Sequence, residues 1–375
     1  MRKHNRLALV LAMLLECGWM SLGSPEIAVG AEHSLSKQQT SRTGRKVSGV
    51  QRIWKDPGAV EKLDFVGGPA GRFRAPRPPF RFVEEDLEGS TPKIKVTDAR
   101  NHTWVIKWGP EVNAEVFATR MAWASGYFVD ATYFVQSGVI LGVRDLKRAK
   151  SVVAPDGRFT DARFELRDKN ARFLKNNNWT WHNNPFVGTR ELNGLKVIMM
   201  LTSNWDNKDA RDQDRGPNTG ILEYRMKDCV ELRYLITDWG GSMGRWGKVF
   251  TREKWDCEGF TGQTPDFIKG IKDGEIKWGY IAQHSSDTKS DIRISDVKWL
   301  LRYVGRITDR QIKTGLAASG ATAAENHCFA RAIRNRIEQT KRVVKGVSPQ
   351  LSSIHRRPDP VSEIKQYGLH QGTLY

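Results

Sequence analysis

Hydrophobic and polar positions first alternate regularly at Lys93. The runs KIKVTD and HTWVIKW, separated by the polar triplet ARN, have the period of two that is typical of strands, and they predict a β-hairpin. After Gly109-Pro110, residues Ala114 to Ser125 place apolar side chains on one helical face, and Gly126 ends this predicted helix. Tyr127 to Gln136 returns to a strand pattern. This part of the chain is therefore predicted to be β-rich with one helix.

Helical periodicity dominates the second half of the chain. A buried helix is predicted from Glu191 to about Leu201, with Thr189 as its N-cap, and Leu232 to Ile236 reads as a strand. Three further helices begin after the capping residues Ser295, Thr308 and Thr322, and they cover Asp296–Tyr303, Asp309–Ala318 and Ala323 to about Arg342. The predicted order is β-rich first and mainly helical later, which is an α+β arrangement.

The segments between these elements are patterned more weakly. Leu141 to Ala149 is predicted to be strand or extended chain. Residues 176–186, NNNWTWHNNPF, predict a loop that exposes Trp179 and Trp181.

The two ends of the chain differ in composition from its middle. Arg2, Lys3 and Arg6 precede the apolar run Leu7–Leu15, and Val29-Gly30-Ala31 has the small residues that a signal peptidase requires. We predict a signal peptide over residues 1–31, with an uncleaved signal anchor as the alternative, and an exported protein. A flexible leader rich in Pro, Gly and Arg is predicted for 32–90, and a tail for 346–375. No other stretch is long and apolar enough to span a membrane.

Charge and cysteine content narrow the function classes. The chain has 375 residues and a net charge of +18, but its basic residues are spread along the sequence without a nucleic-acid-binding module. We therefore expect a basic surface that suits anionic ligands, and we do not expect nucleic acid as a partner. Beyond the signal, Cys229, Cys257 and Cys328 lack metal-binding spacing, which leaves one disulfide with one free thiol, or three thiols.

Candidate chemistry is concentrated between Asn204 and Gly244. Asp206, Asn218 and Asp238 are placed to converge at one end of a hairpin, and two carboxylates with an amide form a minimal set for phosphoryl transfer with Mg²⁺. Upstream, Lys107 ends a strand and Glu115 lies in the first turn of a helix, which is a usual order for a phosphate-binding lysine and its partner. The plainer alternative is an acidic surface loop, a surface lysine and a glutamate at a helix N-terminus.

Other chemistries fit less well. The chain has no Walker loop, no His-Glu-x-x-His motif, no dinucleotide fingerprint and no EF-hand loop. One rival remains. The sequence GGSMG matches the nucleophile elbow of a serine hydrolase directly after a strand, with Ser242 as the nucleophile and His284 or His327 as a base.

Three segments carry a family resemblance. The runs WVIKWGPEVNAEVFATRMAWASGY, LTSNWDNKDARDQDRGPN and YLITDWGGSMG resemble atypical kinases of the HipA, phosphatidylinositol-kinase-like and secreted Fam20 groups. The resemblance implies a two-lobed protein-kinase-like fold, with a β-rich N-lobe over about 91–150 and a mainly helical C-lobe over about 151–345.

The same resemblance implies roles for six residues and a set of ligands. ATP, or another nucleotide, would be held by Lys107, which Glu115 orients. Asp206, or alternatively Asp209, would accept a proton from the acceptor hydroxyl of a protein or small molecule. Asn218 and Asp238 would bind Mg²⁺ or Mn²⁺.

The chain also departs from the family pattern. Its catalytic loop lacks the usual His, twelve positions separate Asp206 from Asn218, and the turn Thr97–His102 has no glycine to cover phosphates. An exported protein also meets ATP only in certain compartments. A pseudokinase that binds a nucleotide or a partner, through its cleft or its tryptophan loop, therefore stays open as an alternative.

Overall fold

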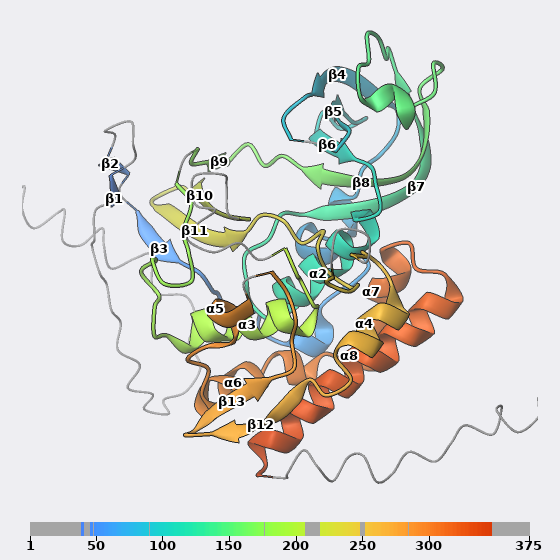
Figure 1. Ribbon diagram of the computed structural model, residues 1–375. Helices are drawn as coiled ribbons and strands as arrows, with labels where there is room; N and C mark the ends of the chain where they lie inside the picture. The colour runs from blue at the N-terminus through green and yellow to red at the C-terminus, as the bar shows by residue number, and fades with distance from the viewer. Residues whose placement is uncertain are drawn as a thin grey trace, which may run out of the picture.

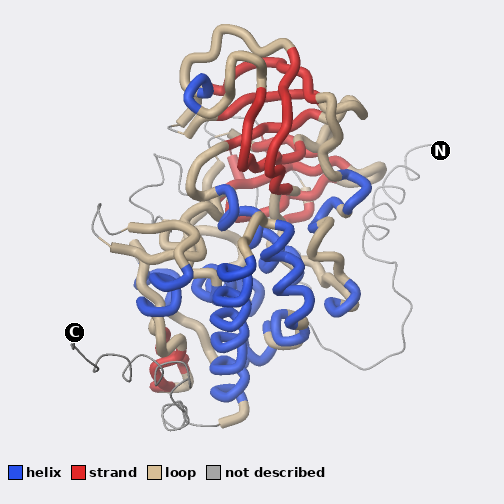
Figure 2. Tube along the Cα trace, turned by 90° about the vertical axis from the view of Figure 1, so that its right-hand side faces the viewer, coloured by secondary structure: helices blue, strands red, loops and turns tan. Residues whose placement is uncertain are grey.

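A computed structural model describes residues 39–40, 46–47, 49–89, 91–175, 177–206, 218–247, 252–283 and 285–346. The predicted signal peptide, nearly all of the predicted tail, Asp209 and His284 lie outside these ranges. Most strands lie toward one end of the molecule and most helices toward the other (Figures 1 and 2). The predicted α+β class, with a β-rich N-terminal part and a helical C-terminal part, is confirmed.

The β-rich part is a closed five-stranded barrel in the order β4-β5-β6-β8-β7. The strands are β4 (Phe80–Asp86), β5 (Lys93–Thr97), β6 (Thr103–Lys107), β7 (Thr132–Leu141) and β8 (Arg158–Leu166). Parallel pairing of β4 with β7 closes it, and the predicted β5–β6 hairpin is confirmed. Its interior is filled by alternate, mostly aromatic side chains: Phe80, Ile94, Trp104, Phe159 and Phe164.

The barrel is longer than predicted at both ends. It begins at Phe80, inside the predicted leader, and runs to Leu166, beyond the predicted lobe boundary near 150. The sequence pattern did not predict β4, because the outward positions of this strand carry charges and the strand follows a proline-rich run. Leu141–Ala149 contributes only the last residue of β7, followed by turns.

Helix α2 (Val112–Ala124) joins the barrel to the helical part. Eleven of its residues are buried, including Glu115 and Arg120, so the helix is enclosed on nearly every side rather than amphipathic. It contacts β7 and β8 on one side and α3 and α7 on the other. The chain that follows α2 reaches β7 only at Thr132, five residues after the predicted start at Tyr127.

A second sheet lies beside the barrel in the order β3-β11-β10-β9. Its strands are β3 (Val50–Arg52), β9 (Ala171–Phe173), β10 (Thr219–Arg225) and β11 (Val230–Ile236). β10 and β11 form an antiparallel hairpin, and β3 pairs with β11 in parallel. The predicted strand before Asp238 is therefore confirmed, and it starts two residues earlier than the pattern indicated.

The helical part contains α3 and five later helices. They are α3 (Arg190–Leu201), α4 (Cys257–Gln263), α5 (Ser285–Lys289), α6 (Ile294–Leu300), α7 (Asp309–Ala318) and α8 (Ala323–Val344). The side chains of Thr189, Thr308 and Thr322 accept N-cap hydrogen bonds, as predicted. The predicted cap at Ser295 is wrong, because α6 already begins at Ile294.

Small elements complete the structure. The remaining strands are β1 (Gln39–Thr40), β2 (Lys46–Val47), β12 (Ile268–Lys272) and β13 (Glu275–Trp278), and the 3₁₀ turns are η2 (Val60–Lys62), η3 (Gly68–Ala70), η4 (Arg72–Arg74), η5 (Ala149–Ser151) and η8 (Val304–Arg306). Within the described ranges, no helix combines the length and the apolar character that a membrane crossing requires.

Residues 49–79 form a strap along the helical part, and their assignment to a flexible leader is wrong. Trp54 donates its indole N–H to the Ser125 carbonyl at 2.8 Å and packs against Trp299 of α6. The Gln311 amide of α7 donates to the Val60 carbonyl at 2.7 Å. Farther along, the Arg120 guanidinium of α2 donates to the Phe65 carbonyl at 2.6 Å. Because the anchoring residues follow no helix or strand period, pattern analysis could not detect them.

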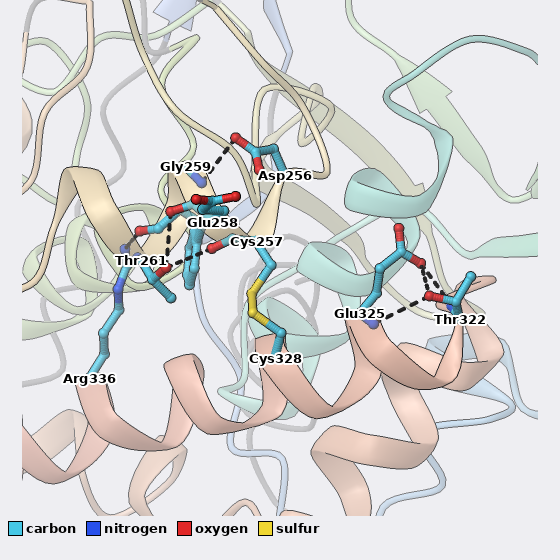
Figure 3. The surroundings of a disulfide bond; sticks show 10 residues. Asp256, Cys257, Glu258, Gly259, Thr261, Thr322, Glu325, Cys328 and Arg336 are labelled. Atoms are coloured by element: carbon cyan, nitrogen blue, oxygen red, sulfur yellow. Dashed lines mark hydrogen bonds between the residues drawn. A yellow bond between two sulfur atoms is a disulfide. The ribbon is translucent and has the colours of Figure 1, made fainter. Parts of the chain in front are cut away.

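A disulfide joins α4 to α8 through Cys257 and Cys328, which are 71 positions apart in sequence (Figure 3). Cys229 keeps its thiol. Of the two arrangements left open by the sequence, one disulfide with one thiol is therefore observed. The Asp256 carboxylate caps α4 by accepting from the Gly259 amide at 3.0 Å.

Trp179 and Trp181 are buried, with exposed fractions of 0% and 3%, so the predicted exposed tryptophan loop is wrong. The two rings pack edge to face, and the Trp179 indole donates to the Gly220 carbonyl at 3.1 Å. The polar residues around them suggested exposure, but the loop folds its rings onto the β10–β11 hairpin. These rings are therefore not available as a partner-binding surface.

Candidate functional site

Lys107 lies at the end of β6, where its side chain points into a buried, charged region. Only 9% of the residue is exposed. Its Nζ lies 3.4 Å from Oε2 of Glu115 on α2 and also pairs with Glu111, which precedes that helix. The Lys107–Glu115 pair that the sequence suggested is therefore present, and a second carboxylate accompanies it.

Glu115 also accepts from a buried arginine on the neighbouring strand. Because β6 and β8 pair with Lys107 opposite Arg163, Nη1 of Arg163 reaches Oε1 of Glu115 at 2.6 Å. The same nitrogen lies 2.8 Å from Glu165, whose other oxygen lies 2.6 Å from Arg167. At the opposite end, Lys254 pairs with Glu111.

These contacts form one row of alternating charge. We call it the ion-pair row, and it consists of Arg167, Glu165, Arg163, Glu115, Lys107, Glu111 and Lys254. Its five inner side chains are buried, whereas those of Arg167 and Lys254 are 51% and 26% exposed. Buried charges persist when each is paired, and here every inner charge has two opposite neighbours.

The row fixes the protonation of its members. Burial lowers the pKa of Lys107, but Glu115, Asp238 and Glu111 outweigh burial, so the pKa is raised and the ammonium form is retained. Burial acts to raise the pKa of Glu111, but Lys107 and Lys254 lower it to about 2. For Glu115, burial outweighs Arg163 and Lys107 and the pKa is raised.

Asp206, Asn218 and Asp238 converge at the open end of the β10–β11 hairpin. The Thr237 amide donates to the Asn218 carbonyl at 2.9 Å, which places Asn218 across from the residue before Asp238. The Asn218 side-chain amide donates to the Asp206 carbonyl at 2.7 Å. The Asn204 amide in turn donates to the Asp238 carbonyl at 3.0 Å.

Two glycines allow this hairpin end to pack closely against Glu111 and Asp206. A Cβ added to Gly240 would lie 2.9 Å from Cβ of Glu111 and 3.0 Å from Oδ1 of Asp238. A Cβ added to Gly241 would lie 2.8 Å from Cβ of Asp206. Such contacts are closer than side chains tolerate, so the Gly-Gly turn packs between Glu111 and the acidic loop as only glycine permits.

Five of the six residues singled out from the sequence therefore lie in one region. Lys107 and Glu115 come from the barrel and α2, and Asp206, Asn218 and Asp238 come from the loop and hairpin beneath them. Asp209 lies outside the described residues.

The hairpin end offers oxygen atoms suited to a divalent cation. Oδ1 of Asp238 accepts from the Gly240 amide at 2.8 Å, which leaves Oδ2 free of that bond, and Asn218 uses its amide nitrogen rather than its oxygen. Oxygen ligands of this kind suit Mg²⁺ or Mn²⁺, and Mg²⁺ commonly takes few protein ligands beside phosphate and water. Within the described ranges, no cluster of three His, Cys, Asp or Glu side chains is arranged around a metal position.

Several residues of the site were not identified from the sequence. Glu111 stands four positions from both Lys107 and Glu115, and that spacing was the only available signal. Arg163 and Glu165 join the site through the register of β8 against β6, and Lys254 joins it from the segment that precedes α4. Sequence spacing carries no information about such contacts.

The serine hydrolase alternative is not supported by the geometry. Ser242 is fully buried, and its hydroxyl has no hydrogen-bond partner in the described part of the chain. A nucleophile elbow instead exposes its hydroxyl next to a base. His327 lies exposed on α8, and His284 is outside the described residues.

Comparison with known proteins finds a distant likeness among solved structures. No protein-family model and no curated protein matches the chain. Among solved structures, the chain is similar to one titled as the crystal structure of the Golgi casein kinase, with a TM-score of 0.38 and 9% identity, over 78% of this chain and 77% of that one. A likeness at this level says nothing about catalysis.

Proposed function

We propose that this protein is an atypical kinase-like phosphotransferase, which moves a phosphoryl group from a nucleotide to a hydroxyl group. The observation that carries the proposal is the buried Lys107, paired with Glu115 and held electrostatically by Asp238. A buried cation beside an acidic, oxygen-rich hairpin end is what phosphoryl transfer needs, because its transition state is stabilised chiefly by fixed charges.

Each residue has a proposed role. The Lys107 ammonium would hold phosphate oxygens of the donor, and Glu115 would keep that ammonium in place. Asn218 and Asp238 would supply oxygen ligands to Mg²⁺ or Mn²⁺, which neutralises phosphate charge when bound. Asp206 would accept the proton of the attacking hydroxyl, and Asp209 remains the alternative for that role.

Glu111 adds a step to the proposed binding of a nucleotide. It occupies the Lys107 ammonium and is itself paired with Lys254. A phosphate must therefore compete with a carboxylate for Lys107, and we propose that nucleotide binding releases Glu111 toward Lys254.

The experiment is a thermal-shift titration with ATP and Mg²⁺ or Mn²⁺, followed by transfer of labelled γ-phosphate. We expect a metal-dependent shift that is lost in Lys107→Met and weakened in Asp238→Asn. Lys95→Met is the matched control, because Lys95 lies on the neighbouring strand but pairs with the exposed Glu84. A wild-type protein that responds to no nucleotide would refute the proposal.

A second function is favoured by one observation. Lys107 is already paired with Glu111, as expected for a module in which this lysine does not hold a phosphate for transfer. Under this alternative, the protein binds a nucleotide or a partner, and Asp206→Asn leaves that binding unchanged. Phosphate transfer that depends on Asp206 rules it out.

Export is part of the proposal. The Cys257–Cys328 disulfide supports it, because disulfides persist in oxidising compartments. The mature N-terminus is then expected at Glu32, which mass spectrometry of the exported protein tests. The donor titration should also include other nucleoside phosphates and diphosphate, since ATP is scarce in some of these compartments.

A further inference from the structure

A cavity of about 710 Å³ lies at the Arg167 end of the ion-pair row. Its walls come from the strap, from the loop between α2 and β7, from the end of β8, and from β9, β10 and β11. None of Lys107, Glu115, Asp206, Asn218 or Asp238 lines it. The volume is in the range of small-molecule sites, which are commonly found where separate structural units meet.

The floor of the cavity is apolar and largely aromatic. It is formed by Trp123, Tyr127, Phe128, Phe173, Leu222 and Tyr224. Phe173 is 44% exposed, which is unusual for a phenylalanine in a folded protein. These rings provide a surface on which a flat apolar body can stack.

One wall is held in place by a stacked arginine. The Arg233 guanidinium lies 3.6 Å from the centre of the Tyr224 ring and 5.0 Å from that of Phe128, and it pairs with Glu231. The Tyr224 hydroxyl donates to Asp168 at 3.1 Å. This wall is therefore preformed, so a ligand need not order it.

Cations predominate in the remaining lining. Lys55 and Arg74 are exposed, and neither has a carboxylate partner in the described part of the chain. Arg167 is half-exposed, pairs with Glu165 and also lies within electrostatic reach of Asp130. The lining also contains two acidic residues. They are Asp168, which accepts a hydrogen bond from Tyr224, and Asp130.

Asp130 repels an anion less than a fully ionised aspartate would. Burial, together with the charge of Glu165, raises the pKa of its carboxyl to about 7. A carboxyl that is about half protonated at neutral pH, and increasingly so below it, can donate a hydrogen bond rather than repel an anionic group. The lining thus combines an aromatic floor with available positive charge.

We propose that this cavity binds a small organic anion with an aromatic body, whose ring stacks on the Phe173–Tyr224 floor while its acidic group faces Lys55, Arg74 and Arg167. The site is independent of phosphoryl transfer and stands whether or not the chain binds a nucleotide.

The test uses a fluorescent aromatic sulfonate, 8-anilinonaphthalene-1-sulfonate, on the full folded chain without nucleotide. We expect one saturable site. Leu222→Trp fills the cavity and should weaken binding more than tenfold, whereas Val139→Trp, which places the same side chain in a separate hollow of the barrel, should leave it unchanged. Ala171→Trp serves as a second filling variant if Leu222→Trp unfolds.

A second experiment distinguishes an anion-binding site from a cavity that binds only through apolar contacts. The double variant Lys55→Gln/Arg74→Gln should weaken the sulfonate about fivefold at low salt, because two exposed charges are lost. It should not change binding of the uncharged N-phenyl-1-naphthylamine. Absence of binding to the wild type, equal binding to the filled variants, or sulfonate binding that ignores both substitutions would each overturn the proposal.

Discussion

Replacing Glu111 with glutamine should lower the free energy of unfolding and should make the Lys107 ammonium more accessible to a phosphate. In the wild type, the Glu111 carboxylate is buried between Lys107 and Lys254. Glutamine keeps the shape and removes the charge. Lys107 then retains Glu115 as its only carboxylate partner in the described structure, and a phosphate no longer has to displace Glu111.

The magnitude follows from the pKa of Glu111. The folded protein lowers it from 4.5 to about 2, and each pKa unit corresponds to about 1.4 kcal/mol of linkage free energy, which gives about 3 kcal/mol at pH 7. Because the folded pKa is the lower one, this stability is fully present above pH 4.5 and is lost as the pH falls toward 2. At pH 3, about 1 kcal/mol should remain.

Urea unfolding of wild type and Glu111→Gln at pH 7, 5, 4 and 3 measures the difference in free energy of unfolding. Glu84→Gln is the control, because Glu84 is exposed and its pair with Lys95 should contribute less than about 1 kcal/mol at any pH. A difference for Glu111→Gln that is equally small, or that does not shrink between pH 5 and pH 3, would show that Glu111 is not held as a buried anion.

The remaining predictions concern stability and reactivity. The double variant Cys257→Ser/Cys328→Ser should lose about 4 kcal/mol of unfolding free energy, from the loop of 71 positions that the bridge closes, and dithiothreitol should reproduce that loss in wild type when unfolding is followed by fluorescence. Trp179→Ala should cost about 3–5 kcal/mol in the same assay, since the ring is fully buried; a change below about 0.5 kcal/mol would restore the exposed-loop hypothesis. Ser242 should not label with a fluorophosphonate probe, and stoichiometric labelling there would revive the hydrolase.

The local elements of this fold were predictable because their signals are local. The threonine caps at Thr308 and Thr322 and the hairpin around Asp98–His102 depend on residues a few positions apart, and the structure has them where the pattern indicated. The convergence of Asp206, Asn218 and Asp238 was also accessible, since one hairpin brings them together.

The rest depends on contacts between distant segments. Arg163 reaches Glu115 only because β8 pairs beside β6, and no spacing in the sequence reports that register. Trp179 looked exposed because its neighbours are polar, yet the β10–β11 hairpin covers it. The strap was missed for the same reason, since Trp54 finds its partners in α6, about 245 positions later.

The strap changes how the two parts of the molecule can move. Counting α2 with the barrel, the described chain passes between barrel and helical part at two places, near residues 71–80 and near residues 167–171. A single chain connection would allow the two parts to rotate about many axes. Two connections restrict that rotation to the axis that passes through both. Ala70 and Arg74 lie near one attachment, Arg167 and Asp168 at the other, and all four line the same cavity. A molecule bound in that cavity would therefore contact both connections between the two parts.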